Sequence, residues 1–267
     1  MCTPPGPDGS INPAMLVAAD LCGIQEIYKV GGAQAIAALA FGTETIRPVD
    51  KIVGPGNLYV GIDMVAGPSE VLIVADETAN PRYVAADLLS QAEHDKVAAP
   101  ILITTSEALA TAVQAELPAQ LAALPRAEIA RAALENNGAI LLAEDLDTAF
   151  DLANLVAPEH LELCIADAFS HLGKVRNAGA CFLGHFSPEP LGDYFAGPNH
   201  VLPTSGTARF FSPLTVQDFL KRTSIVYYSR EKLASSYEDI ARFARAEKLE
   251  AHARSAEIRF LDGEKEG

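Results

Sequence analysis

The sequence predicts an α/β fold with mostly parallel strands. Short runs of apolar and β-branched residues alternate with alanine-rich stretches of helical length, which is the pattern of chains that build parallel sheets. Apolar residues make up 49% of the 267 residues, so the chain has enough apolar side chains for a substantial core.

The first elements are a strand, a helix and a second strand. The strand "EIYKV" covers 26–30 and leads through Gly31-Gly32 into the helix "AQAIAALAF" at 33–41. A further strand, "DKIVG", is expected over 50–54. The glycines favour a tight turn before the helix, although the spacing lacks the dinucleotide fingerprint.

The middle of the chain gives the clearest pattern. The run "EVLIVAD" at 70–76 is apolar on both faces, as in a buried parallel strand. Asn80 then caps a helix that has Pro81 at its first position and runs through "LLSQAEH". Two more buried strands, "PILITT" and "GAILLAED", lie on either side of a long helical region at 106–135.

The amino-acid composition of the sequence changes after about residue 157. Glycine, proline and aromatic residues dominate 177–214, which predicts a long functional loop. A strand, "SIVYYS", is expected over 224–229, and one or two charged helices over 230–260.

Charge and cysteine content exclude several classes of protein. The net charge of −15 opposes binding to nucleic acid or to an anionic membrane surface. No apolar run reaches the length of a membrane span, and the first residues do not resemble a signal peptide. The four scattered cysteines indicate neither a disulfide framework nor a thiolate zinc site. We therefore expect a cytoplasmic protein.

Gln91 and His94 are the first candidate metal ligands. Their three-residue spacing places both side chains on one helical face. Zinc accepts such nitrogen and oxygen ligands, although glutamine is an unusual one. A polar helix end that faces water is the alternative interpretation.

Other candidates are histidines beside acidic residues. Glu159 and His160 lie at a junction between helix and strand and could form a general acid/base pair, or else a solvent-facing turn. His200 follows Asp193 by seven residues, and Gly192 would allow Asp193 an unusual backbone geometry, although simple turn chemistry explains the same residues. His252 is typical of an exposed helical histidine.

Taken together, seven segments in order resemble histidinol dehydrogenase. They are "VGGAQAIAALAFGTETI", "VDKIVGPGN", "AGPSEVLIVAD", "DLLSQAEHD", "APEHLEL", "GDYFAGPNHVLPT" and "DFLKRTS". The resemblance covers nearly the whole chain from about Thr3. It implies two Rossmann-like α/β domains with mostly parallel sheets, plus a C-terminal helical segment. The expected domains are a shortened nucleotide-side domain at 1–66, a main domain with the zinc and substrate site at 67–215, and a dimer-exchanged strand and helices at 216–267.

The resemblance also implies the site residues. One Zn²⁺ per subunit would be held by Gln91, His94, Asp193 and His252. Glu159 and His160 would be the acid/base pair. Substrate contacts would come from the ligands and His160 together with Ser69, His200 and Glu247, and NAD contacts from Gln34 and Asn57.

The activity implied is oxidation of L-histidinol to L-histidine through L-histidinaldehyde, with two hydride transfers to NAD, in histidine biosynthesis. His160 would take the alcohol proton, and Glu159 would activate water for the second step. The segment with Glu247 and His252 would come from the partner of a homodimer, so that the two subunits share the site.

Two departures from the family pattern affect the cofactor side. The chain begins after a portion that family members carry, and the stretch "GPGNLYVGIDMVAG" is shorter than in the family. We therefore expect a truncated and internally shortened family member with weak NAD affinity. The alternatives are a zinc- and histidinol-binding homologue without turnover, and a zinc hydrolase in which Glu159 activates water.

Overall fold

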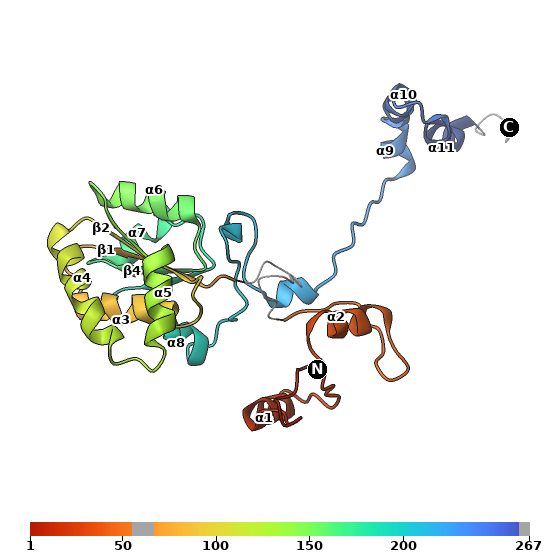
Figure 1. Cartoon of the computed structure of the whole chain (residues 1–267). Helices are drawn as coiled ribbons and strands as arrows, with labels where there is room; N and C mark the ends of the chain where they lie inside the picture. The colour runs from red at the N-terminus through yellow and green to blue at the C-terminus, as the bar shows by residue number, and fades with distance from the viewer. Residues whose placement is uncertain (55–66, 262–267) are drawn as a thin grey trace. The chain divides into compact units, whose positions relative to one another are not determined.

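A computed structural model describes residues 1–54 and 67–261, in which five parallel strands form one sheet (Figure 1). The strand order is β3-β2-β1-β4-β5. The strands are β1 (Glu70–Ala75), β2 (Ala99–Thr104), β3 (Ala139–Leu142), β4 (His160–Cys164) and β5 (Ala180–Leu183). From β1 the chain adds β2 and β3 on one side, and β4 then pairs with the other side of β1. The predicted α/β fold with a parallel sheet is confirmed.

Helices lie on both faces of this sheet. Those that follow or precede its strands are α3 (Pro81–Ala92), α4 (Glu107–Leu121), α5 (Ala127–Asn137), α6 (Leu146–Val156), α7 (Ala168–His171) and α8 (Glu189–Tyr194). Short 3-10 turns cover Leu172–Lys174, Thr207–Arg209 and Val216–Phe219. The helical region expected at 106–135 is therefore two helices, α4 and α5.

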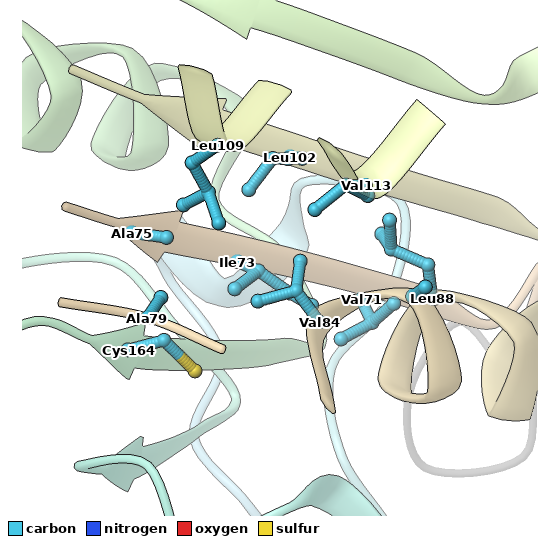
Figure 2. Close-up of a cluster of buried hydrophobic side chains, with 11 residues drawn as sticks. Val71, Ile73, Ala75, Ala79, Val84, Leu88, Leu102, Leu109, Val113 and Cys164 are labelled. Carbon is cyan, nitrogen blue, oxygen red and sulfur yellow. The ribbon is translucent and has the colours of Figure 1, made fainter. Parts of the chain in front are cut away.

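The centre of the sheet is β1, whose side chains alternate between two apolar clusters. Val71 and Ile73 pack with α3 and α4 on one face, where Leu88 and Val113 join them (Figure 2). Leu72 and Val74 pack against α6 on the other face. All five residues from Val71 to Ala75 are fully buried, so the apolar run correctly predicted a buried parallel strand.

Two strand predictions differ in detail. β3 was expected to be buried, but its residues Ile140, Leu141 and Leu142 are 36–59% exposed because β3 is an edge of the described sheet. Residues 177–214 are not one loop, because β5 and α8 lie within them.

Helix α3 begins as expected and ends earlier than expected. The Asn80 side chain accepts the Arg82 N–H at 2.9 Å, and Pro81 occupies the first turn. The helix ends at Ala92, so His94 lies in the following turn, with its N–H donated to the Gln91 carbonyl. The two side chains therefore do not share one helical face: Gln91 is buried and His94 is exposed.

Residues 1–54 contain α1 (Pro13–Leu21), α2 (Gly32–Phe41) and one isolated parallel bridge between Cys2 and Tyr28. The strands predicted over 26–30 and 50–54 are therefore wrong as regular strands. A strand needs a neighbour to accept and donate its main-chain hydrogen bonds, and in this region only the single bridge at Tyr28 supplies one.

The chain divides into two compact units, Met1–Phe219 and Leu220–Gly267. In the second unit the described elements are α9 (Arg230–Ala234), α10 (Tyr237–Ala246) and α11 (Glu250–Leu261). The α10–α11 pair buries Ala241, Ala244 and Ala253. The strand predicted at 224–229 is wrong, since this segment has no regular structure and exposes Ile225, Val226 and Tyr227 at 84–90%. The three expected domains stay a prediction.

Within the described residues, none of the helices has both the length and the apolar character that crossing a bilayer requires.

Candidate functional site

The candidate site lies at the amino ends of two neighbouring strands, β1 and β4. Their register pairs Val71 with His160, which brings Glu70 and Glu159 side by side just before the paired residues. Each acid then binds the other's main chain. Glu70 N–H donates to Glu159 Oε2 at 3.1 Å, and Glu159 N–H donates to Glu70 Oε2 at 3.3 Å. Two reciprocal hydrogen bonds thus join Glu70 and Glu159, which are far apart in sequence.

Glu159 is a buried acid, with only 7% of its surface exposed. Burial raises the pKa of its carboxyl to about 8, and the negative charges of Glu70 and Asp193 act in the same direction. The hydrogen bond from Glu70 N–H opposes this effect without cancelling it. Burial therefore favours the protonated form of Glu159 over a wider pH range than that of an exposed carboxyl.

His160 is the first residue of β4 and is 2% exposed, so the solvent-facing turn considered from the sequence is wrong. Its Nδ1 lies 2.9 Å from the Glu70 carbonyl oxygen. A carbonyl oxygen only accepts, so Nδ1 carries the proton and Nε2 keeps a lone pair. Burial lowers the pKa of His160 to about 4, which keeps the imidazole neutral at neutral pH, with the lone pair of Nε2 available.

Glu189 is a site residue that sequence reasoning missed. Its Oε1 lies 3.6 Å from His160 Nε2, and both atoms are buried without a hydrogen-bond partner in the described part of the chain. Ligand atoms of His160, Glu189 and Asp193 lie within 4.8 Å of one another. Burial raises the pKa of Glu189. The signal was present, because Glu189 precedes Asp193 by four residues and shares its helical face in α8.

Asp193 also binds His200, whose Nδ1 lies 2.7 Å from Asp193 Oδ1. This contact unites the two residues that the sequence placed in one loop. Gly192 has a different purpose from the one expected. It lies inside α8, and a Cβ there would come within 2.8 Å of the Phe182 ring. Glycine is thus needed for close approach to β5, not for an unusual backbone angle.

Gln91 provides the test of whether the expected donors suit zinc. Its side chain is 1% exposed, and Oε1 finds no hydrogen-bond partner among residues 1–54 and 67–261. Buried amide oxygens are normally satisfied, so this atom is consistent with a ligand outside the protein chain. The charge of His94 also influences the pKa of His160, as do the charges of Asp193 and His200. Gln91, His94 and Asp193 offer nitrogen and oxygen donors without thiolate, and a donor set of this chemistry fits a zinc ion.

The remaining expected residues are distributed as follows. Ser69 is half-buried and directly precedes Glu70 in the site. Gln34 is exposed in the first turn of α2, close to Gly32. Asn57 lies outside the described residues. Glu247 caps α10 and His252 lies in α11, and both are exposed on the second compact unit.

Two further acids beneath the site were also missed. Glu162 in β4 is 1% exposed, and its Oε1 accepts the Glu189 N–H at 2.8 Å. A ligand atom of Asp87 in α3 lies within 4.8 Å of one of Glu162. A charged residue inside an apolar strand, as in "HLELC", was the signal, because isolated charges are rarely buried without a role.

Comparison with known proteins identifies the family of the chain. The family model described as histidinol dehydrogenase matches residues 1–260. The histidinol dehydrogenases of Caldanaerobacter subterraneus subsp. tengcongensis and Bacillus subtilis are 59% and 57% identical to the chain, over 98% and 97% of its length. The chain spans 63% of the length of each of these relatives.

A solved structure agrees as well. The crystal structure of histidinol dehydrogenase from Elizabethkingia anophelis superposes with a TM-score of 0.90 at 45% identity, and the match covers 97% of this chain and 62% of that one. The matched fold, the ordered motifs and the buried Glu159–His160 pair lead to one conclusion: the chain belongs to the histidinol dehydrogenase family.

Proposed function

We propose that this chain carries the chemistry of an NAD- and zinc-dependent dehydrogenase that oxidises L-histidinol to L-histidine through L-histidinaldehyde. Family membership and a site suited to acid/base work support the proposal. One observation carries it: a neutral, buried imidazole with a free Nε2 lies beside a buried acid that titrates near neutral pH.

His160 is the proposed base for the alcohol proton. The Glu70 carbonyl holds the Nδ1 proton and so fixes the ring with Nε2 as the acceptor. Oxidation of an alcohol requires its hydroxyl proton to leave as hydride is transferred. A neutral imidazole at a fixed position can accept that proton and then pass it on before the second step.

Glu159 is the proposed base for water in the second step, in which the aldehyde is hydrated before it loses hydride. The pKa of its carboxyl is raised to about 8 by burial, with a contribution from the charge of Asp193. Neutralising the Asp193 charge removes one of the causes that raise this pKa. The carboxylate form of Glu159, which accepts a proton from water, is then more populated at neutral pH.

Gln91, His94, Asp193 and His252 are the proposed zinc ligands, and Gln34 and Asn57 the proposed NAD contacts. Zinc would supply Lewis-acid polarisation and positioning of the substrate, and NAD would supply the hydride acceptor. Ser69, His200 and Glu247 are the proposed additional substrate contacts. Of these, His200 already has a fixed orientation through its contact with Asp193.

The proposed assembly is a homodimer whose subunits share the site. Glu247 and His252 lie on the second compact unit, which also exposes the apolar residues Ile225, Val226 and Tyr227. A contiguous apolar segment of this kind favours contact with another protein surface. The mass of the particle in solution tests the dimer.

An NADH-production assay with L-histidinol tests the function. We expect activity that a chelator abolishes and that added zinc restores. Zinc and histidinol binding without NADH would contradict turnover and support a binding homologue instead. Hydrolysis of an ester or amide, with no NADH formed, would support the hydrolase alternative.

A further inference from the structure

Strand β4 turns one row of polar side chains toward helix α3. Leu161 and Leu163 belong to the cluster on the α6 face, whereas Cys164 belongs to the α3 face. Because side chains alternate along a strand, His160 and Glu162 face α3 together with Cys164. The catalytic imidazole and a fully buried acid are therefore on the same face, one strand repeat apart.

Helix α3 presents its own polar row to this strand. Ligand atoms of Asp87, Glu162 and Cys164 lie within 4.8 Å of one another. Gln91 follows Asp87 by one helical turn and so continues the same row. Asp87 thus contacts Glu162 one helical turn before the proposed ligand Gln91 on α3.

Glu162 also forms a hydrogen bond with the first residue of α8. Its Oε1 accepts the Glu189 N–H at 2.8 Å, while its Oε2 is buried and finds no hydrogen-bond partner in the described residues. Two ionised carboxylates in contact, with Glu162 buried and Asp87 half-buried, would repel each other and be poorly solvated. A single proton between them removes the repulsion and satisfies Oε2.

We propose that Asp87 and Glu162 hold one proton between them, and that this acid pair ties α3, which carries Gln91, to α8, which carries Asp193. The functional part rests on the proposed zinc site, because Gln91 and Asp193 are its proposed ligands. The shared proton itself requires no metal. Asp87 and Glu162 are positioning residues, since neither is placed against substrate or cofactor.

The surroundings of the pair favour a proton over a second metal ion. Glu162 Oε1 is already engaged by the Glu189 N–H, which leaves one oxygen for a ligand. Burial, together with the charges of Glu162, Asp87 and Asp76, raises the pKa of the Cys164 thiol, so the thiolate that binds metals is disfavoured. The charged groups that raise the pKa of Glu162 are Asp87 and Glu189, both acidic.

The tie between α3 and α8 should therefore weaken at alkaline pH. Burial raises the pKa of both Asp87 and Glu162 above the ordinary carboxyl range. A carboxyl with a raised folded-state pKa binds its proton more tightly in the folded chain, so its contribution to stability is lost as the pH rises through that pKa. Loss of the proton leaves two negative charges between α3 and α8.

Replacement of Glu162 by glutamine removes the titrating proton and keeps a side chain of the same shape. In Glu162→Gln the amide oxygen can accept the Glu189 N–H, and the amide N–H can donate to Asp87 without any titrating proton. Glu162→Leu removes both contacts. Asp151→Asn is the matched control, because Asp151 is an exposed acid paired with Arg176 outside the site.

The first readout is the infrared spectrum of the metal-free full chain at neutral pH. We expect a protonated-carboxyl stretch in the wild type and in Asp151→Asn, with contributions from the acid pair and from other buried carboxyls such as Glu159. In Glu162→Gln the band should lose the intensity of one carboxyl. No such band in the wild type, or a band of equal intensity in the wild type and in Glu162→Gln, overturns the shared proton. Failure of the proposed zinc or dehydrogenase function leaves this readout unchanged, so the two outcomes are distinguishable.

The second readout is zinc affinity, measured by competition with a chelator at pH 7 and pH 9. Glu162→Gln should match the wild type at pH 7 and bind about tenfold more tightly than the wild type at pH 9. Parallel pH profiles for these two proteins overturn the tie between α3 and α8. If the wild type binds a second equivalent of metal and Cys164→Ser does not, a metal ion rather than a proton lies between Asp87 and Glu162, which overturns the proposal. If Glu162→Leu fails to fold, Glu162→Gln still decides the question.

Discussion

His160 Nδ1 lies 2.9 Å from the main-chain oxygen of Glu70, the first residue of the neighbouring strand. This contact determines which ring nitrogen is free, because a carbonyl oxygen can only accept. The parallel pairing of β1 and β4 therefore selects the imidazole tautomer as well as holding the ring. The catalytic predictions below depend on this arrangement.

Replacing His160 by asparagine should abolish turnover and leave zinc content unchanged. Asparagine can still donate a hydrogen bond to the Glu70 carbonyl, but it cannot accept the alcohol proton. Loss of a general base costs about 10²–10⁴-fold in rate. Steady-state NADH production and metal analysis check this, and a variant that loses its zinc would instead show that His160 has a structural role.

Replacing Glu159 by glutamine should separate the two oxidations. The amide keeps an oxygen to accept the Glu70 N–H, but it cannot take a proton from water. A single turnover from L-histidinol should then form one NADH, while oxidation of L-histidinaldehyde should fall by about 10²-fold or more. Equal loss of both steps would contradict the division of roles between Glu159 and His160.

The stability of the metal-free chain should decrease on both sides of a middle pH. The pKa of Glu159 is raised to about 8, so its protonated form stabilises the fold and this contribution is lost as the pH rises from the ordinary carboxyl range through about 8. The pKa of His160 is lowered to about 4, so stability is lost as the pH falls below that of an ordinary imidazole toward about 4.

Thermal unfolding across this range checks the sign of each contribution. Glu159→Gln should flatten the alkaline side, and His160→Asn the acidic side. Each pKa unit corresponds to about 1.4 kcal/mol, so the changes should be measurable. Unchanged slopes in both variants would show that other groups dominate the titration.

Replacing Gly179 by alanine should disturb Glu159 without touching its side chain. A Cβ at Gly179 would lie 2.5 Å from the Glu159 carbonyl oxygen, which is main chain and cannot rotate away. We expect a loss of about 1–3 kcal/mol in unfolding free energy, together with lower activity. Gly173→Ala is the control, because a Cβ there meets nothing within 4 Å and should change little. Equal unfolding free energies and activities in the two variants would show that the main chain next to β5 can shift to accommodate the extra Cβ.

Local patterns predicted the elements that have a strong sequence signal. The apolar run of β1 and the Asn80 cap of α3 are where the sequence placed them. The strands expected over 26–30 and 224–229 failed because the sequence of one segment does not reveal whether another strand lies beside it. For the same reason β3 is more exposed than its composition suggests.

The sequence by itself determined the α/β class, the family and the candidate pair Glu159–His160, because these depend on residue types and their order. Only the tertiary structure brought Glu70, at the amino end of β1, and Glu189, in α8, to that pair. Glu70 and Glu159 are 89 positions apart, and their contact exists because β1 and β4 are neighbours in the sheet. Burial, which raises the pKa of one member of the pair and lowers that of the other, is likewise a property of the assembled layers.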